Sequence, residues 1–162
     1  MEIILGRTAG FCYGVKNAVS NAEEKLKEYK NLYCLGELVH NGQVVKKLEN
    51  LGLKVIEKFE SPDNKVIIRA HGIAKEIYNK AKQMDIELLD FTCPKVLKIH
   101  DIAQEYSNNG YYIFLIGGKK HPETIGTISF CGENSYIIEE EKQIMEGINL
   151  LKKSNIKKLL II

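Results

Sequence analysis

Closely spaced cysteine pairs are missing from this sequence. Its four cysteines are Cys12, Cys34, Cys93 and Cys131, and no two of them have CxxC spacing. The sequence therefore lacks the signature of a zinc ribbon, a thioredoxin-like dithiol or a c-type haem site. Cytosolic thiols usually stay reduced, so we expect any site shared by these cysteines to be assembled by the fold from distant segments.

A strong charge of one sign and a long apolar run are also missing. The chain has 23 Lys and Arg against 21 Asp and Glu, a formal net charge of +2 in 162 residues. This balance gives no general case for binding nucleic acid or a membrane surface. The longest apolar runs are far shorter than a membrane span, and the first ten residues lack a signal-peptide pattern. We therefore predict a cytoplasmic protein with neither nucleic-acid nor membrane partners.

Nucleotide-binding motifs are absent as well. The sequence contains neither GxxxxGK[ST] nor GxGxxG, so a nucleotide-binding function would rest on fold class alone. It also has no low-complexity segment and no Pro-rich or Ser/Gly-rich linker. We expect any second domain to pack against the first.

The hydrophobic pattern alternates between strand-like and helix-like segments. Such alternation predicts parallel sheets covered by helices, the α/β class. A turn is expected at 61–64, between two of the strands. The predicted strands are 3–5, 32–35, 54–56, 66–68, 86–90, 111–116, 136–138 and 159–162, and the predicted helices are 15–29, 44–51, 75–84, 94–107 and 140–151.

Two stretches of similar composition divide the chain into lobes at 1–92 and 93–162. Each begins near a cysteine that precedes a helix. Because the chain stops on an apolar segment that resembles the start of a buried strand, we expect the natural polypeptide to continue and the second lobe to be incomplete.

Cys12 and Cys93 occupy similar positions in the predicted pattern. Each follows a predicted strand and begins a predicted helix, where the helix dipole and the free N–H groups favour a thiolate. A thiolate there is a nucleophile or a metal ligand, whereas the plainer alternative is a small buried residue in a tight turn. Two cysteines in equivalent turns favour a shared site. Cys34, inside a strand, and Cys131, without a partner motif, are predicted to be structural.

Three histidines also fall in turns at predicted strand ends: His40, His71 and His121. Ligands of α/β proteins bind at this edge, and imidazoles there suit an anionic or phosphorylated ligand. Glu123 lies two residues beyond His121 in a predicted loop, where it could transfer a proton or simply favour a helix start. His100 is predicted to lie in mid-helix and receives no role.

The candidate residues lie in five short motifs along the chain. The motifs are Gly10-Phe11-Cys12-Tyr13-Gly14-Val15, Leu38-Val39-His40-Asn41, Arg69-Ala70-His71-Gly72, Asp90-Phe91-Thr92-Cys93-Pro94 and His121-Pro122-Glu123-Thr124-Ile125-Gly126-Thr127. Any one motif alone would be unspecific. Together, in this order and at this spacing, they resemble the 4-hydroxy-3-methylbut-2-enyl diphosphate reductase family, IspH/LytB.

This resemblance implies an oxidoreductase of non-mevalonate isoprenoid biosynthesis, which removes the substrate hydroxyl as water and yields isopentenyl and dimethylallyl diphosphate. It implies an oxygen-sensitive 4Fe–4S cluster with Cys12 and Cys93 as two of three ligands. His40, His71 and His121 would hold the diphosphate, and Glu123 would relay a proton. An electron donor such as ferredoxin or flavodoxin is implied as a partner.

The resemblance also implies a three-lobed, pseudo-threefold fold in which residues 1–12 contact a third lobe. The family's third cysteine ligand, and further Ser, Thr and Asn residues of the diphosphate site, lie in later segments than this sequence contains. We therefore expect little or no turnover from the 162 residues alone. Two alternatives stay open from the residues themselves: a hydrolase or transferase with a cysteine nucleophile, and a non-catalytic module that binds a phosphorylated metabolite.

Overall fold

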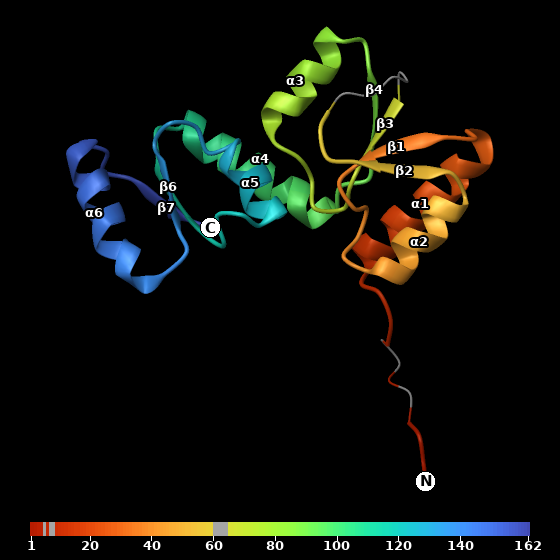
Figure 1. The fold of residues 1–162 in the computed structure, drawn as a ribbon. Coiled ribbons are helices and arrows are strands. Elements are labelled where there is room, and N and C mark those ends of the chain that lie inside the picture. The colour runs from red at the N-terminus through yellow and green to blue at the C-terminus, as the bar shows by residue number, and fades with distance from the viewer. Residues whose placement is uncertain (5, 7–8, 60–64) are drawn as a thin grey trace.

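The structure is a computed structural model that describes residues 1–4, 6, 9–59 and 65–162. The described residues form two parallel sheets, each flanked by helices (Figure 1). The elements are α1 (Tyr13–Glu28), β1 (Leu32–Leu35), α2 (Gly42–Asn50), β2 (Leu53–Ile56), β3 (Lys65–Ile68), α3 (Lys75–Gln83), β4 (Glu87–Asp90), α4 (Pro94–Asn108), β5 (Tyr112–Ile116), α5 (Pro122–Ile128), β6 (Ser135–Ile138), a 3-10 helix (Glu141–Gln143), α6 (Ile144–Lys153) and β7 (Leu159–Ile161).

The first sheet has the strand order β2-β1-β3-β4 and the second has the order β6-β5-β7, with every pairing parallel. Parallel strands need crossover connections, and α2, α3, α5 and α6 lie in those from β1 to β2, β3 to β4, β5 to β6 and β6 to β7. The predicted α/β class with repeated parallel-sheet units is confirmed. The division at residues 92 and 93 stays a prediction, although β4 and α4 lie on either side of it.

Successive side chains of a central strand point to opposite faces of the sheet, and helices cover both faces. In β3, Ile67 packs into the core beneath α1 and α2, while the preceding Val66 packs with α3. In β5, Ile113 faces α4 and α5, while Tyr112 and Phe114 pack with α6. Buried on both faces, these strands are apolar at successive positions. Full burial of a side chain such as Ile67 contributes about 1.5–3 kcal/mol.

Local sequence sets several helix boundaries. The Asn41 side chain caps α2 by accepting the Val44 N–H at 3.1 Å. Past the end of α2, Gly52 has φ of +109° and takes the left-handed conformation that suits glycine. Pro94 begins α4, as predicted, because its missing N–H would have no helical partner there.

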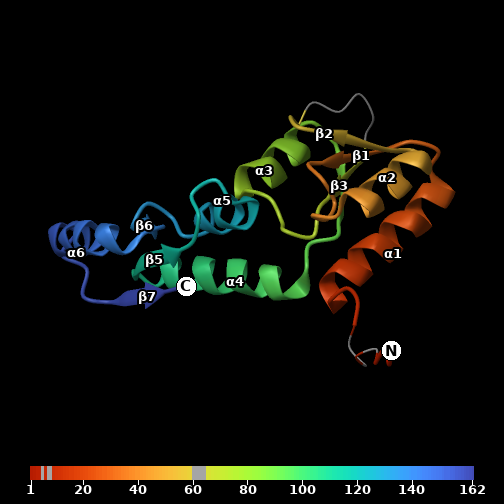
Figure 2. The same cartoon turned by 60° about the horizontal axis from the view of Figure 1, so that its bottom comes forward.

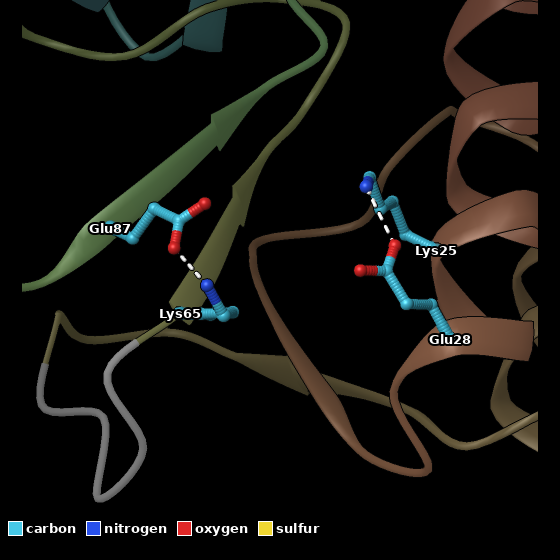
Figure 3. Close-up of polar contacts among 4 residues, drawn as sticks. All are labelled: Lys25, Glu28, Lys65 and Glu87. Atoms are coloured by element: carbon cyan, nitrogen blue, oxygen red, sulfur yellow. Dashed lines mark hydrogen bonds and ion pairs between the residues drawn. The ribbon is translucent and has the colours of Figure 1, made fainter.

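Two exposed ion pairs lie on α1 and on the first sheet (Figure 3). Lys25 and Glu28, three residues apart on α1, are 2.7 Å apart. Lys65 and Glu87 pair across the register of β3 and β4. Exposed pairs of this kind contribute little to stability, so the Lys65–Glu87 pair reflects the register of β3 and β4 rather than determining it.

The structure departs from two predictions about secondary structure, and a third prediction lies outside the described residues. The strand at 3–5 is absent from its described part: Ile3 and Ile4 are 78% and 83% exposed and pair with no described strand. A strand needs a partner for its backbone groups, which these residues lack here. Leu5 and the predicted turn at 61–64 lie outside the described residues. The predicted helix at 140–151 is a 3-10 turn followed by α6.

α5 is the third departure, because the prediction placed Glu123 in a loop. Pro122 starts this seven-residue helix, and His121 is its N-cap. Its sequence contains Gly126 and two threonines, which are poor helix formers, so propensity gave little signal. Packing of Thr124, Gly126 and Thr127 into the buried side of α5 stabilises the helix instead.

Among the described residues, no helix combines the length and the apolar character that crossing a bilayer requires.

Candidate functional site

The histidines of three loops form one cluster. His40 follows β1, His71 follows β3, and His121 follows β5, so the cluster joins loops from both sheets. The ring centroids of His40 and His71 are 4.3 Å apart, and each lies 6.3 Å from the centroid of His121. The structure thus brings together all three histidines named from sequence. A triangle of imidazoles at strand ends offers several N–H donors to one anion.

His71 is the most enclosed member of the cluster. Its Nδ1 is buried and has no hydrogen-bond partner among the described residues. Burial, with smaller contributions from the neighbouring His40, Arg69 and His121, lowers the pKa of His71 to about 4. Without an anion the ring is therefore neutral at pH 7. A phosphate group would reverse that balance, because an opposite charge favours the protonated ring.

His121 is exposed, as His40 is, and is oriented by its own helix. The backbone N–H of Glu123 donates to Nδ1 of His121 at 3.3 Å. When the ring is neutral, its proton therefore lies on Nε2, where it can be donated to a ligand. This contact also fixes Glu123 in the first turn of α5, two residues from the ring.

A hollow of about 330 Å³ lies at the carboxyl end of β5. Glycines of the β5–α5 turn form one side of it, and His121 and Glu123 form another. His40 and His71 are not part of its lining. Thr124 and Thr127 also line this hollow, and sequence reasoning gave neither a role. Their position inside a resembling motif was the only available signal.

Cys12 and Cys93 are both helix N-caps, of α1 and α4. Cys12 is exposed and Cys93 is half-buried. The Cys93 Sγ faces the first turn of α1 so closely that a Cβ atom built on Gly14 would lie 2.5 Å from it. Glycine is thus required at this approach, and the two cysteines border the same helix start. Both helices direct free N–H groups toward this region.

The same region is tied to the histidine cluster. The backbone N–H of Cys93 donates to the carbonyl of Ala70, next to His71, at 2.9 Å. Asp90 organises the turn before Cys93 by accepting from the Thr92 N–H at 2.9 Å and from the Tyr78 hydroxyl at 2.8 Å. The sequence placed Asp90 in a motif but did not predict that its carboxylate holds this turn by hydrogen bonds.

No group of three or more His, Cys, Asp or Glu side chains is arranged for a metal ion within the described parts of the chain. Cys12 and Cys93 supply two thiols, one fewer than the family resemblance implies for a cluster. The remaining cysteines lie elsewhere and are fully buried. Burial raises the pKa of Cys34 to about 12 and that of Cys131 to about 11, so both thiols stay protonated and suit packing.

These features define a class: an α/β protein that gathers N-capping cysteines and a histidine cluster at the carboxyl edge of its parallel strands. The family model described as LytB protein matches residues 3–162, and the chain belongs to this family.

Its relatives carry a consistent description. The chain is 44% identical over 149 residues to the 4-hydroxy-3-methylbut-2-enyl diphosphate reductase of Caldanaerobacter subterraneus, covering 88% of this chain and 52% of the relative. It is also 44% identical to the reductase of Clostridioides difficile over 151 residues, covering 91% and 54%. The chain thus spans about half the length of the curated relatives it matches.

Solved structures agree with this family. The reductase of Plasmodium falciparum matches with a TM-score of 0.83 and 36% identity over 96% of this chain and 49% of that one. A second structure, described as the terminal enzyme of the non-mevalonate pathway, matches with a TM-score of 0.79 and 33% identity over 99% of this chain and 66% of its own. The fold is therefore shared across the described chain.

Proposed function

We propose that this chain serves the reductive dehydroxylation of 4-hydroxy-3-methylbut-2-enyl diphosphate, supplying part of the active site. The proposal rests chiefly on one observation: the cluster of three histidines from two sheets lies beside a loop that hydrogen-bonds to Cys93. Family membership and the description of the relatives support the same reaction.

The histidines act as the diphosphate-binding group. Burial of His71, together with the nearby His40, Arg69 and His121, disfavours protonation of that ring while the site is empty. A diphosphate brings negative charge beside His71 and favours its protonated form, so binding is coupled to proton uptake by His71. Nε2 of His121 donates from the open side, because its Nδ1 already accepts from the chain. The ligand is therefore held from both sheets.

Glu123 relays a proton to the leaving hydroxyl in this proposal. Removing the hydroxyl as water consumes two electrons and two protons, and the oxygen that leaves must receive a proton. Glu123 lines the hollow beside His121, so its carboxyl can face a substrate whose diphosphate is held by the histidines.

Cys12 and Cys93 fit an iron–sulfur cluster in the chemistry of their donor atoms. Thiolate sulfur is the ligand that iron–sulfur clusters use, and both cysteines stand at helix N-termini. When bound, a 4Fe–4S cluster would supply the electrons for the reduction. A ferredoxin or flavodoxin would be the class of donor that replenishes them. No described histidine hydrogen-bonds to either thiol, which favours metal ligands over a cysteine nucleophile.

Substrate binding tests the proposal on the chain itself. We expect the substrate diphosphate to bind in a 1:1 complex by calorimetry, and the dephosphorylated alcohol to bind at least about tenfold more weakly. Equal binding of the two would contradict the proposal. After anaerobic iron and sulfide reconstitution we expect little or no turnover, because two cysteine ligands are present where the resemblance implies three. Robust turnover would show that the chain forms a complete centre.

A further inference from the structure

His100 is a buried polar side chain that the proposed reaction does not use. It lies in α4, is 2% exposed, and neither ring nitrogen has a hydrogen-bond partner among the described residues. A buried polar group without a partner costs about 1–3 kcal/mol. Favourable packing of the His100 ring must offset that cost. The contacts of the ring therefore indicate what the residue does.

Those contacts join three segments. The His100 ring stacks on Phe130 with centroids 4.4 Å apart and an interplanar angle of 15°. A Cβ atom built on Gly72 would lie 2.9 Å from Cε1 of the ring, and one built on Gly126 would lie 3.5 Å from Nε2. The ring thus occupies space that a side chain at position 72 would enter, and it lies in van der Waals range of position 126.

Both glycines belong to segments that carry histidines of the cluster. Gly72, with φ of +73°, follows His71 directly, and Gly126 lies in α5, whose N-cap is His121. Figure 2 shows α4 passing α5 on its way from the first sheet to the second. A hydrogen bond from the Lys75 N–H to the Ser129 hydroxyl, at 2.8 Å, joins the same segments. His100 therefore packs where the two halves of the cluster meet.

We infer that His100 is a positioning residue, whose ring holds the His71 loop and α5 at the separation that lets histidines of both sheets contact one diphosphate. This inference rests on the proposed function. The ring acts through its shape, since its nitrogens bond to no described group. Burial lowers the pKa of His100, which keeps the ring neutral and compatible with such packing.

The experiment compares inorganic diphosphate with orthophosphate by calorimetry at pH 7. Orthophosphate can bind at the His40–His71 pair alone, whereas diphosphate must extend to His121. We expect His100→Ala to weaken diphosphate binding about tenfold and orthophosphate binding less than about twofold. Phe130→Leu, which removes the stacking partner, should lower the same preference about threefold. Ile148→Ala, a core truncation in α6 away from the cluster, is the control and should leave both affinities unchanged.

The preference for diphosphate separates positioning from a general loss of stability, which would weaken both ligands in proportion to the unfolded fraction. If His100→Ala or, should that variant fail to fold, Phe130→Leu keeps the wild-type preference, the inference is overturned while the proposed function stands. If the wild-type chain binds no diphosphate, the proposed function fails and the inference fails with it.

Discussion

The two sheets contribute different chemistry to the candidate site. Loops at the edge of the four-stranded sheet carry His40 and the enclosed His71, and both N-capping cysteines border this sheet. The three-stranded sheet contributes His121, which is exposed, and Glu123, which lines an open hollow. In the proposed function, the thiols and two of the three histidines therefore belong to the first sheet, and the proposed proton relay belongs to the second.

This difference shows how one site can hold both a histidine that attracts an anion and a carboxylate that would repel it. An enclosed imidazole responds strongly to an arriving anion, because little water screens it. A carboxylate needed for proton transfer must avoid repelling that anion, and an open hollow leaves it solvated. Placing the enclosed histidine on one sheet and the carboxylate on the other keeps the two groups in these different environments. The predictions that follow test this division, from the largest expected effect to the smallest.

Thiol chemistry should be confined to the first-sheet side. Cd²⁺ serves as a soft-metal probe, and we expect one ion per chain with a thiolate charge-transfer band in the ultraviolet. Cys93→Ser or Cys12→Ser should remove most of that band, because a single thiol remains. Cys131→Ser, at a buried cysteine that packs with β5, is the matched control and should retain the band. A full band in Cys93→Ser would remove that residue from the proposed site.

The enclosed histidine should matter more than the exposed one. His71→Ala removes a desolvated donor to the anion, and we expect inorganic diphosphate to bind about 10- to 100-fold more weakly by calorimetry. His121→Ala removes an exposed donor, for which a loss of about threefold is expected. Equal losses would show that enclosure does not set the contribution of each ring.

Acid should destabilise the chain through the first-sheet side. The pKa of His71 is about 4 when folded and near its ordinary value of 6.5 when unfolded, so the unfolded chain binds more protons between those values. Stability must then fall as pH drops through this window. We expect the free energy of unfolding to decrease by about 1–2 kcal/mol from pH 7 to pH 5 on account of His71.

Urea titrations at the two pH values measure this change, and His71→Gln isolates the contribution of the ring. The lowered pKa of His100 acts in the same direction and remains in that variant. An unchanged slope of stability against pH in His71→Gln would mean that His71 titrates normally in the folded chain.

The smallest effect is expected at Glu123. Replacing it with glutamine removes a negative charge beside the proposed anion site while keeping the shape of the side chain. Because solvent screens this carboxylate, we expect diphosphate to bind at most about threefold more tightly. A calorimetric titration of Glu123→Gln that showed clearly weaker binding would mean that Glu123 helps to hold the anion.

Most of the fold was predictable because its periodicity is strong. Successive apolar residues in β3 and β5 indicate strands buried on both faces, and the predicted α/β class follows from their alternation with helices. α5 was missed because glycine and threonine residues obscure its helical pattern, and tertiary packing determines it. The predicted strand at 3–5 failed because an apolar run shows that a segment could pair, without showing that a partner exists.

The sequence identified the residues of the candidate site but not how they are arranged in space. Turn positions and motif resemblance identified His40, His71 and His121, and the structure places them in one cluster. Sequence could not reveal the enclosure of His71 or the packing of His100, because both depend on contacts between distant loops. The close approach of Cys93 to Gly14 likewise joins residues 79 positions apart.

A double-mutant cycle tests the central claim, that histidines from both sheets bind one anion. Diphosphate affinity would be measured by calorimetry for the wild type, His71→Ala, His121→Ala and the double variant. If one ligand bridges both rings, the losses are coupled, and the double variant should lose clearly less binding free energy than the sum of the single losses. Losses that simply add would contradict a single shared site.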